Sequence, residues 1–291
     1  MNSDGTISDG FPASRPEMMT ARMTARSPAR VIALANQKGG VGKTTTAINL
    51  GAALAQSGKQ VLLVDLDPQG NASTGLGIGP ERRAVSTYHV LTEGRTIAEV
   101  ALRCGDLSLF VAPASADLSG IDAELAATPD RSHRLRAALR HSGDDAPTHC
   151  YDYIIIDCPP SLNLLTVNAL AAADTVLVPL QCEFFALEGL TQLLGTIKRI
   201  QARLNPPLRM QGIVLTMYDR RNNLSAQVAE DVRLNLGDTV YQTIIPRNVR
   251  LSEAPSYALP GLLYDPDCAG SQAYRALAGE LMRRDTAVLA A

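Results

Sequence analysis

The chain has 291 residues, of which 46% are hydrophobic and 19% are charged, a mixture that supports a sizeable buried core and excludes a wholly disordered or collagen-like chain. Aromatic residues make up only 4% and Trp is absent, so this core must be built from Ala, Val, Ile and Leu. Lys and Arg number 27 against 29 Asp and Glu, and the formal net charge of −2 excludes a global basic field, so nucleic-acid binding would need a local patch.

The N-terminal residues 1–30 differ in composition from the rest of the chain. They are rich in Ser, Gly, Pro, Thr and Arg and show no apolar period, which predicts a disordered N-terminal arm. They also lack the apolar core of a secretory signal, and no later run approaches the ~18 uninterrupted apolar residues of a membrane-spanning helix. The five cysteines are scattered without a C-x-x-C pair, so we expect a cytoplasmic protein with reduced thiols and no membrane association.

Short apolar runs separated by helical patterns follow this arm. They predict buried strands at 31–35, 61–65, 107–112, 153–157, 175–179, 210–216 and 242–245, and helices at 44–56, 117–127, 131–141, 162–172, 186–203, 225–236 and 271–284. This alternation is typical of an α/β fold, with a doubly wound, mainly parallel sheet covered by helices on both faces. We expect one domain at 31–285 and a flexible tail at 286–291.

A glycine-rich segment between the first strand and the first helix carries the strongest chemical signal. Glycines let backbone N–H groups turn inward around phosphate oxygens, and the following helix directs its positive dipole end at the same anion. Lys43 is expected to contact the β- and γ-phosphates, and the Thr44 hydroxyl to ligate Mg²⁺. The predicted nucleotide site, in a sheet of the P-loop NTPase type, comprises Lys38, Gly39, Gly40, Val41, Gly42, Lys43, Thr44 and Thr45.

Acidic residues stand where two other predicted strands end. Asp157 closes an apolar run, where an exposed acid is poorly placed unless it serves a site, and we assign it to the Mg²⁺ side. Asp65 and Asp67 follow the second strand and share one direction if the strand geometry continues. No Asn-Lys-x-Asp guanine motif occurs, so we expect ATP rather than GTP.

The loop departs from the standard G-x-x-x-x-G-K-S/T pattern in having Gln37 at its first position, beside a second lysine, Lys38. This K-G-G-x-G-K-T-T form resembles the deviant phosphate loop of the ParA/MinD group of dimeric ATPases. The resemblance implies that Lys38 reaches the nucleotide of the partner subunit, so that ATP holds a homodimer together. The segment from Asp65 to Asn71 is similar to the D-x-D-P-Q-x-N segment of ParA proteins, which implies that Asp67 activates water and that Asp65 is its metal or water neighbour.

Four further segments extend the resemblance to chromosome-partitioning ATPases of the ParA/Soj type over roughly 31–284. They are Asp157-Cys-Pro-Pro-Ser161, the run from Pro179 to Gly189, Leu215-Thr-Met-Tyr-Asp219 and the run from Thr243 to Pro255. The resemblance implies a slow ATPase that segregates DNA and is stimulated by a ParB-type, centromere-binding partner. It also implies that Pro246 and Asn248 contact the nucleotide.

ParA dimers bind DNA without sequence preference, and the charge distribution agrees with such a role. Residues 197–250 carry nine Lys and Arg against four acids, whereas 31–196 and 251–291 together carry fourteen against twenty-two. A basic stretch on an acidic chain is what contact with DNA phosphates requires. Arg221 and Arg250 match DNA contacts of the family, with Arg247 next, and the resemblance implies a nucleoid-associated protein in which dimerisation couples DNA affinity to ATP.

Two other functions share parts of this pattern. A MinD-like, membrane-cycling regulator of cell division needs a basic amphipathic C-terminal helix with bulky apolar residues, and residues 282–291 have few of these. A reductase like the nitrogenase iron protein needs paired cysteines around a cluster at the dimer interface, and Cys104 and Cys150 do not lie in matching motifs. The MinD-like regulator remains the alternative function, and the reductase is rejected.

Overall fold

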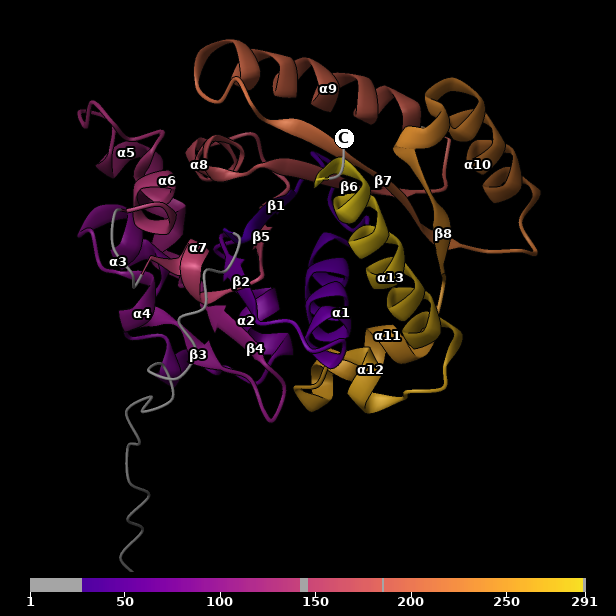
Figure 1. Cartoon of the computed structure of the whole chain (residues 1–291), viewed down its shortest axis with the longest axis horizontal. Coiled ribbons are helices and arrows are strands. Elements are labelled where there is room, and N and C mark those ends of the chain that lie inside the picture. Colours follow the sequence, from indigo (N-terminus) through magenta and orange to yellow (C-terminus); the bar gives the residue numbers. More distant parts are fainter. Residues whose placement is uncertain (1–27, 142–145, 185, 290–291) are drawn as a thin grey trace, which may run out of the picture.

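An eight-stranded sheet runs through the middle of the computed structural model, which describes residues 28–141, 146–184 and 186–289 (Figure 1). Its strands are β1 (Arg30–Leu34), β2 (Val61–Asp65), β3 (Leu102–Arg103), β4 (Leu109–Ala112), β5 (Tyr153–Asp157), β6 (Thr175–Gln181), β7 (Arg209–Tyr218) and β8 (Val240–Pro246). Their order is β3-β4-β2-β5-β1-β6-β7-β8, and all pairs are parallel except β3 with β4. The predicted fold class is confirmed.

Each central strand is buried on both faces, which explains why the strands are continuous apolar runs. In β1, Val31 and Ala33 join one core cluster, whereas Ile32 and Leu34 join the other. Such burial follows from the alternation of side chains in a strand between two helical layers. Parallel strands run in the same direction, so the carboxyl ends of β1, β2 and β5 lie at the same end of the sheet. The loops that follow these three strands therefore lie together there.

The helices form one layer on each face of the sheet (Figure 1). One layer contains α1 (Lys43–Gln56), α2 (Asn71–Gly75), α11 (Val249–Glu253), α12 (Gly261–Tyr264) and α13 (Ala269–Leu289). The other contains α3 (Thr87–Thr92), α4 (Ile97–Val100), α5 (Ile121–Glu124), α6 (Arg134–Leu139), α8 (Leu164–Ala172), α9 (Ala186–Arg203) and α10 (Asn223–Leu236). Shorter turns complete the described chain: α7 (Pro147–Cys150), η1 (Pro80–Arg82), η2 (Ala116–Gly120), η3 (Gly237–Thr239) and η4 (Ala254–Tyr257).

The predicted elements differ from the structure mainly in length. The helix expected at 117–127 is divided between η2 and α5, and the one expected at 131–141 is reduced to α6. Strand β3 and the helices of four to six residues at α2, α3, α4, α7, α11 and α12 were not predicted, because so few residues hold less than two turns of an apolar period.

The two ends of the domain also differ from the expected boundaries. Ala29 is buried and donates its backbone N–H to the carbonyl of Thr148, so the packed chain starts before residue 31, while residues 1–27 of the expected arm lie outside the described residues. Helix α13 continues to Leu289, past the helix end expected at residue 284, and the flexibility expected for 286–291 stays a prediction. The Ala residues of this segment favour helix beyond the last turn that the apolar period marks.

Candidate active site

The glycine-rich loop lies between the end of β1 and the start of α1, as its sequence predicts. Gly40 and Gly42 have φ of 74° and 86°, in the left-handed region that side chains with a Cβ disfavour. A Cβ at Gly39 or Gly40 would meet no atom within 4 Å apart from chain neighbours, so open space faces the loop. The loop therefore leaves room for an anion beside the N-terminus of α1.

Lys43 sits in the floor of this loop with only 6% of its surface exposed. Its Nζ donates a hydrogen bond to the carbonyl oxygen of Lys38 at 3.0 Å, which closes the loop around its side chain. Burial lowers the pKa of Lys43, while the charges of Asp157, Cys158 and Asp67 act in the opposite direction. The structure thus brings Lys43, Asp157 and Asp67 close enough to interact electrostatically.

Asp157 is completely buried at the carboxyl end of β5. Neither of its carboxylate oxygens has a hydrogen-bond partner among the described residues. Burial and the charge of Asp65 raise its pKa well above the ordinary value, against the opposing effects of Thr44 and Lys43. A buried carboxylate whose nearest hydroxyl is that of Thr44, and which makes no other hydrogen bond to the described residues, is the donor set expected to hold Mg²⁺, directly or through water.

Asp65 lies beside Asp157 in the register of β2 and β5, but its surroundings differ. One oxygen accepts hydrogen bonds from the backbone N–H and the hydroxyl of Ser73 at 2.9 and 2.7 Å, and the other accepts from the N–H of Asp67 at 3.2 Å. Burial raises the pKa of Asp65 to about 6. Both oxygens are therefore used within the protein, which favours Asp157 over Asp65 as the metal-side carboxylate.

Asp67 is half-buried and follows β2 by two residues. One of its carboxylate oxygens accepts the N–H of Gln69 at 3.0 Å, which fixes the turn that leads into α2. The hydrogen bonds of Asp65 to Ser73 and to the N–H of Asp67 tie this turn to the start of the same helix. Asp65 therefore positions Asp67, whose carboxylate lies at the open edge of the site.

The Lys38 side chain forms an ion pair with Glu183, which follows β6, while the Lys38 backbone carbonyl accepts the hydrogen bond from Lys43. The Lys38 side chain is 44% exposed and that of Glu183 is 31% exposed, so this pair lies at the surface next to the loop. The backbone N–H of Lys38 donates to the Oδ1 of Asn36 at 3.0 Å. Within one chain, the second lysine is thus held at the rim of the loop.

A cavity of about 280 Å³ lies beside the first two turns of α1. Its lining includes Thr44, Thr45 and Asn49 from α1, and Leu251 and Pro255 from the segment after β8. Pro246 and Asn248 are not among the residues that line it. Asn248 uses its side-chain oxygen to accept the N–H of Arg250 at 2.9 Å, as the cap of α11, so its contact with a nucleotide stays a prediction.

The nine basic residues of 197–250 do not form one patch. Arg209 starts β7 and Arg221 follows its end, and ten strand residues span about 30 Å. Lys198, Arg199 and Arg203 belong to the last turns of α9, near the amino end of β7. The single patch that the charge count suggests is therefore wrong, and the side chains near the carboxyl ends of β7 and β8 form a separate group.

This group consists of Arg220, Arg221 and Arg247, which we call the β7–β8 basic group. Arg221 is 90% exposed and is paired with Asp219 through two hydrogen bonds of 3.1 Å. Arg247 is exposed, and its backbone N–H donates to the carbonyl of Tyr218 at 2.9 Å, which links β8 to the end of β7. Arg250 differs, because it pairs with Glu253 at 2.9 Å and with Asp265 at 3.4 Å.

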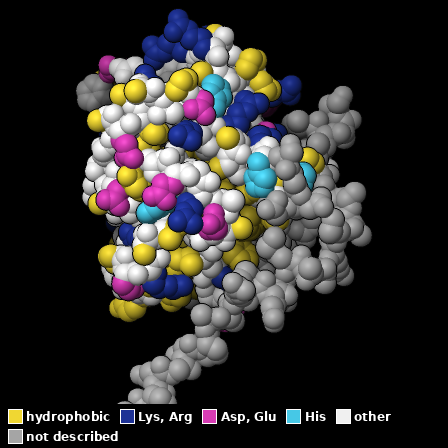
Figure 2. All heavy atoms as spheres, turned by 90° about the vertical axis from the view of Figure 1, so that its left-hand side faces the viewer, with side chains coloured by type: hydrophobic (Ala, Val, Ile, Leu, Met, Phe, Trp, Pro, Cys, Tyr) yellow, Lys and Arg dark blue, Asp and Glu magenta, His cyan; other side chains and the backbone are white. Residues whose placement is uncertain are grey.

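The β7–β8 basic group lies away from the face of the molecule that carries α3 to α6. On the described part of that face, a group of Lys and Arg side chains lies at the top, and below it Lys and Arg are interspersed with Asp, Glu and His (Figure 2). Arg140, for example, pairs with Asp174 at 2.6 Å. Such mixed surfaces are ordinary for a soluble domain and do not favour a polyanion.

Sequence reasoning missed two residues of this site. Glu183 lies within the predicted run from Pro179 to Gly189, but an acid near a strand end gives no hint that it pairs with a lysine 145 residues earlier. Ser73 follows the D-x-D segment by six residues, and its two hydrogen bonds to Asp65 depend on the left-handed turn at Gly70. The Asp-Pro-Gln-Gly sequence could have indicated this turn.

Comparison with known proteins decides the family. A family model described as an AAA domain matches residues 29–210. The chromosome partitioning protein ParA of Caulobacter vibrioides is 61% identical over 259 residues, which cover 89% of this chain and 96% of that protein. The chain belongs to the ParA/Soj family of chromosome-partitioning ATPases. The sporulation initiation inhibitor Soj of Bacillus subtilis is 51% identical over 87% of this chain and 98% of its own length.

Solved structures agree with this ParA/Soj assignment in fold. A cobyrinic acid a,c-diamide synthase from Mycobacterium smegmatis with bound ADP and magnesium has a TM-score of 0.75 and 39% identity, over 89% of this chain and 96% of that one. The cell division ATPase MinD of Pyrococcus furiosus has a TM-score of 0.71 and 25% identity, over 88% and 99%. The predicted ParA/MinD group and P-loop ATPase fold are confirmed.

Proposed function

We propose that this ParA/Soj family member is an ATP-driven switch for DNA segregation, which hydrolyses ATP to ADP and phosphate. The observation that carries the proposal is the buried pair of Lys43 and Asp157 at the glycine-rich loop, which influence each other electrostatically; we assign the lysine to the phosphates and the carboxylate to the cation. The relatives at 51–61% identity, which include a chromosome partitioning protein, support DNA segregation as the cellular process. The synthase named at 39% identity is less similar, so partitioning is favoured.

The residues present fit a magnesium ion at the loop. Thr44 and Asp157 would hold Mg²⁺, which when bound supplies positive charge that offsets the charge of the phosphate oxygens. Lys43 and the N–H groups of residues 39–45 bind the phosphates from the other side. This arrangement lowers the barrier by positioning charge, because phosphoryl transfer asks for little covalent chemistry from the protein.

Asp67 is our proposed residue for orienting the attacking water. Its carboxylate follows β2, next to Lys43 and Asp157, and is held in a turn by Gln69 and Asp65. No histidine is proposed as a base, so we expect slow turnover that a ParB-type partner accelerates. The partner, rather than this chain alone, would then set the rate of hydrolysis.

ATP-dependent dimerisation is our proposed role for Lys38. The ion pair with Glu183 holds its ammonium at the rim of the loop, outside its own nucleotide site. In a face-to-face dimer, Lys38 would exchange this carboxylate for the terminal phosphate of the partner's ATP. An added cation near that phosphate favours the triphosphate-bound dimer and loses part of its partner charge after hydrolysis.

Nonspecific DNA is our proposed partner of the β7–β8 basic group. Arg221 and Arg247 are exposed, and a dimer would present each of them twice. Arg250 is a weaker candidate, since DNA would have to compete with two acids for its guanidinium. Binding through phosphates alone would make the affinity strongly dependent on salt and would place the protein on the nucleoid.

The membrane-cycling alternative is less well supported. The C-terminal helix α13 lies along α1 and β8 (Figure 1), and its Leu277 and Leu281 are fully buried in the core between them. The apolar surface of these two leucines is therefore buried inside the domain. Of the helices in the described ranges, none has the length and apolar character needed to span a bilayer.

Retention of DNA by the ATP-bound form tests the proposed switch. The Asp67→Ala variant should bind ATP without hydrolysing it, so with ATP and Mg²⁺ it should bind a random-sequence duplex at least tenfold more tightly than with ADP. Fluorescence anisotropy at fixed salt measures both affinities, and Lys43→Ala serves as the control that does not bind nucleotide. Equal affinities of Asp67→Ala for DNA with ATP and with ADP would contradict the switch.

A further inference from the structure

A hydrogen bond from the end of β7 holds the back of the glycine-rich loop. The Thr216 hydroxyl donates to the backbone carbonyl of Val41 at 2.8 Å. Both residues are buried, with 2% and 1% of their surfaces exposed, so water does not replace this hydrogen bond easily. The two residues are 175 positions apart in the chain, so the contact exists only in the folded protein.

The backbone next to Thr216 has an unusual conformation. Met217 has φ of 52°, one of two positive φ values among the described residues other than glycine. Consecutive strand side chains normally point to opposite faces. Here the Cβ that a residue other than glycine would carry at position 42 lies 3.9 Å from the Thr216 Cβ and 4.0 Å from the Met217 Cε. Both neighbouring side chains therefore face Gly42.

Other contacts maintain this unfavourable conformation. The carbonyl of Tyr218 accepts the N–H of Arg247 at 2.9 Å, and the carbonyl of Thr216 accepts the N–H of Cys182 at 3.4 Å. A left-handed residue other than glycine costs free energy and persists where its surroundings determine it. The strands on both sides of β7 thus hold Thr216 and Met217 against the loop.

A second buried polar residue holds the front of the loop. The amide nitrogen of Asn36 donates to the carbonyl of Pro179 in β6 at 2.8 Å, while its oxygen accepts the N–H of Lys38 at 3.0 Å. Asn36 therefore connects the entrance of the loop to β6, and Thr216 connects its exit to β7. These hydrogen bonds fix the loop at both ends.

We propose that Thr216 is a positioning residue for nucleotide binding, which sets the direction of the Gly42 N–H. In a trans peptide the carbonyl of Val41 and the N–H of Gly42 point in opposite directions. Because Thr216 draws the carbonyl toward β7, the N–H is turned away from β7, into the loop. Without the hydroxyl, this peptide group is free to rotate and one phosphate-binding donor loses its fixed direction.

This inference rests on the proposed nucleotide site but on neither DNA binding nor dimerisation. Thr216→Val keeps the shape of the side chain and removes the hydroxyl, whereas Thr216→Ser keeps the hydroxyl. We expect Thr216→Val to weaken the binding of fluorescent ATP and ADP analogues about tenfold, and Thr216→Ser to stay within twofold of the natural protein. Thr216→Ala is a second variant without the hydroxyl, and circular dichroism checks that each variant is folded.

A positioning role also predicts which kinetic constant changes. The Michaelis constant for ATP should rise about tenfold in Thr216→Val while turnover at saturating ATP stays within twofold, because the Thr216 hydroxyl bonds to the backbone of the loop at Val41. Natural protein that binds no nucleotide would refute the proposed function itself. Two results would overturn only the role of Thr216. One is that Thr216→Val and Thr216→Ala bind nucleotide as tightly as the natural protein does, and the other is that Thr216→Ser loses as much affinity as Thr216→Val.

Discussion

Asp157 is a carboxylic acid that the fold buries completely without a hydrogen bond from any described residue to its oxygens. Burial and the nearby Asp65 raise its pKa well above 3.8. A carboxyl group whose pKa is raised by folding stabilises the protein most at low pH, and this contribution is lost as the pH rises from the unfolded pKa through the folded one. Its ionised form is therefore a cost to the free protein near neutral pH.

The Asp157→Asn variant should remove this cost. In magnesium-free buffer without nucleotide, we expect it to unfold at higher urea than the natural protein, with a free-energy gain that grows between pH 5 and pH 8 to about 1–3 kcal/mol. Its ATPase activity should fall at least a hundredfold at the same time. Two stability curves that run parallel over this pH range would show that folding does not raise the pKa of Asp157.

The sequence predicts the positions of the acids better than their roles. Asp65 and Asp157 both end apolar parallel strands, so their patterns are equivalent and both were assigned to the metal. The difference comes from Ser73, which donates two hydrogen bonds to Asp65 and none to Asp157. Thr216 lies in the segment from Leu215 to Asp219 that resembles ParA proteins, but its contact could not be predicted, since its partner Val41 is 175 positions away and the strand conformation breaks at Met217.

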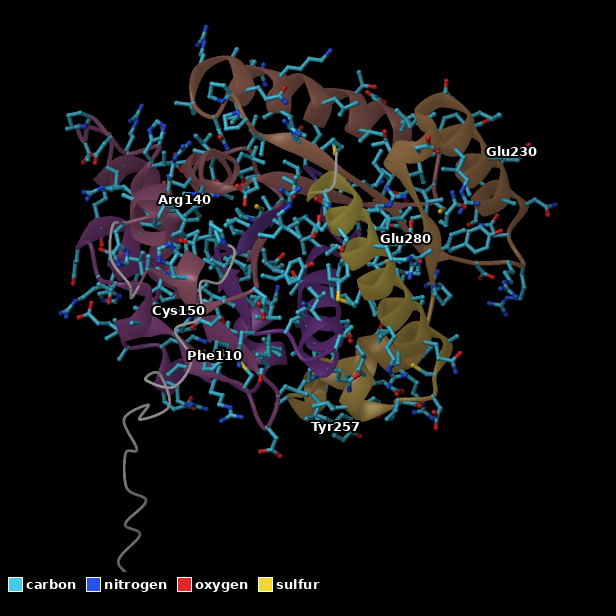
Figure 3. All side chains as sticks on the ribbon, in the orientation of Figure 1. Phe110, Arg140, Cys150, Glu230, Tyr257 and Glu280 are labelled. Carbon is cyan, nitrogen blue, oxygen red and sulfur yellow. The ribbon has the colours of Figure 1, made fainter. Side chains whose placement is uncertain are left out.

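At the scale of elements, α13 holds the edge of the sheet through one acidic side chain. Glu280 points from α13 to β8 (Figure 3) and accepts the backbone N–H groups of Gln242 and Thr243, each at 2.9 Å. It also accepts hydrogen bonds from the Thr243 hydroxyl and from Arg284. Burial alone would raise the pKa of Glu280, but these hydrogen bonds outweigh it and lower the pKa.

The Glu280→Gln variant should destabilise the protein by about 1–3 kcal/mol, because two backbone donors of β8 lose a charged acceptor. Glu230→Gln, on the exposed side of α10 (Figure 3), is the matched control and should stay within about 0.5 kcal/mol. A carboxylate whose pKa is lowered by folding stabilises the protein at pH values above its unfolded pKa, which is near 4.5 for Glu280. This stabilisation is lost as the pH falls through the folded pKa. The difference should therefore shrink in urea unfolding at acidic pH, and equal losses in both variants would contradict the role of Glu280.

Long elements could be predicted and short ones could not. Strands β1, β2 and β5 are uninterrupted apolar runs because both of their faces are buried, and α9 spans 18 residues, enough for a clear apolar period. In contrast, α2, α11 and α12 have four or five residues each, and their conformation depends on contacts with α1 and α13. These short helices surround the cavity beside the loop, so sequence reasoning found the loop but missed much of its wall.

At the scale of the whole molecule, charge is divided between the two ends of β7. We expect Arg221→Glu and Arg247→Glu each to weaken the binding of random-sequence DNA at least tenfold in the ATP state, and to reduce its salt dependence. Arg250→Glu should have a smaller effect, because Glu253 and Asp265 already neutralise this side chain. Anisotropy titrations at several salt concentrations measure both quantities.

Arg203→Glu is the matched control for these variants. It makes the same change of charge on an exposed arginine, but near the amino end of β7, whose ten residues span about 30 Å, whereas Arg221 follows the carboxyl end. DNA affinity within twofold of the natural protein is the expected result. If Arg203→Glu were as damaging as Arg221→Glu, DNA binding would follow the total charge of the molecule and not the β7–β8 basic group.

The molar mass of the ATP-bound protein tests the central claim most directly, namely that ATP joins two chains through Lys38. Light scattering should show a dimer for Asp67→Ala with ATP and Mg²⁺, a monomer of about 31.0 kDa with ADP, and a monomer with either nucleotide once Lys38→Ala is added. ATP binding by the double variant, measured separately, ensures that only the contact between chains is lost. A dimer that persists unchanged in the double variant would contradict the account.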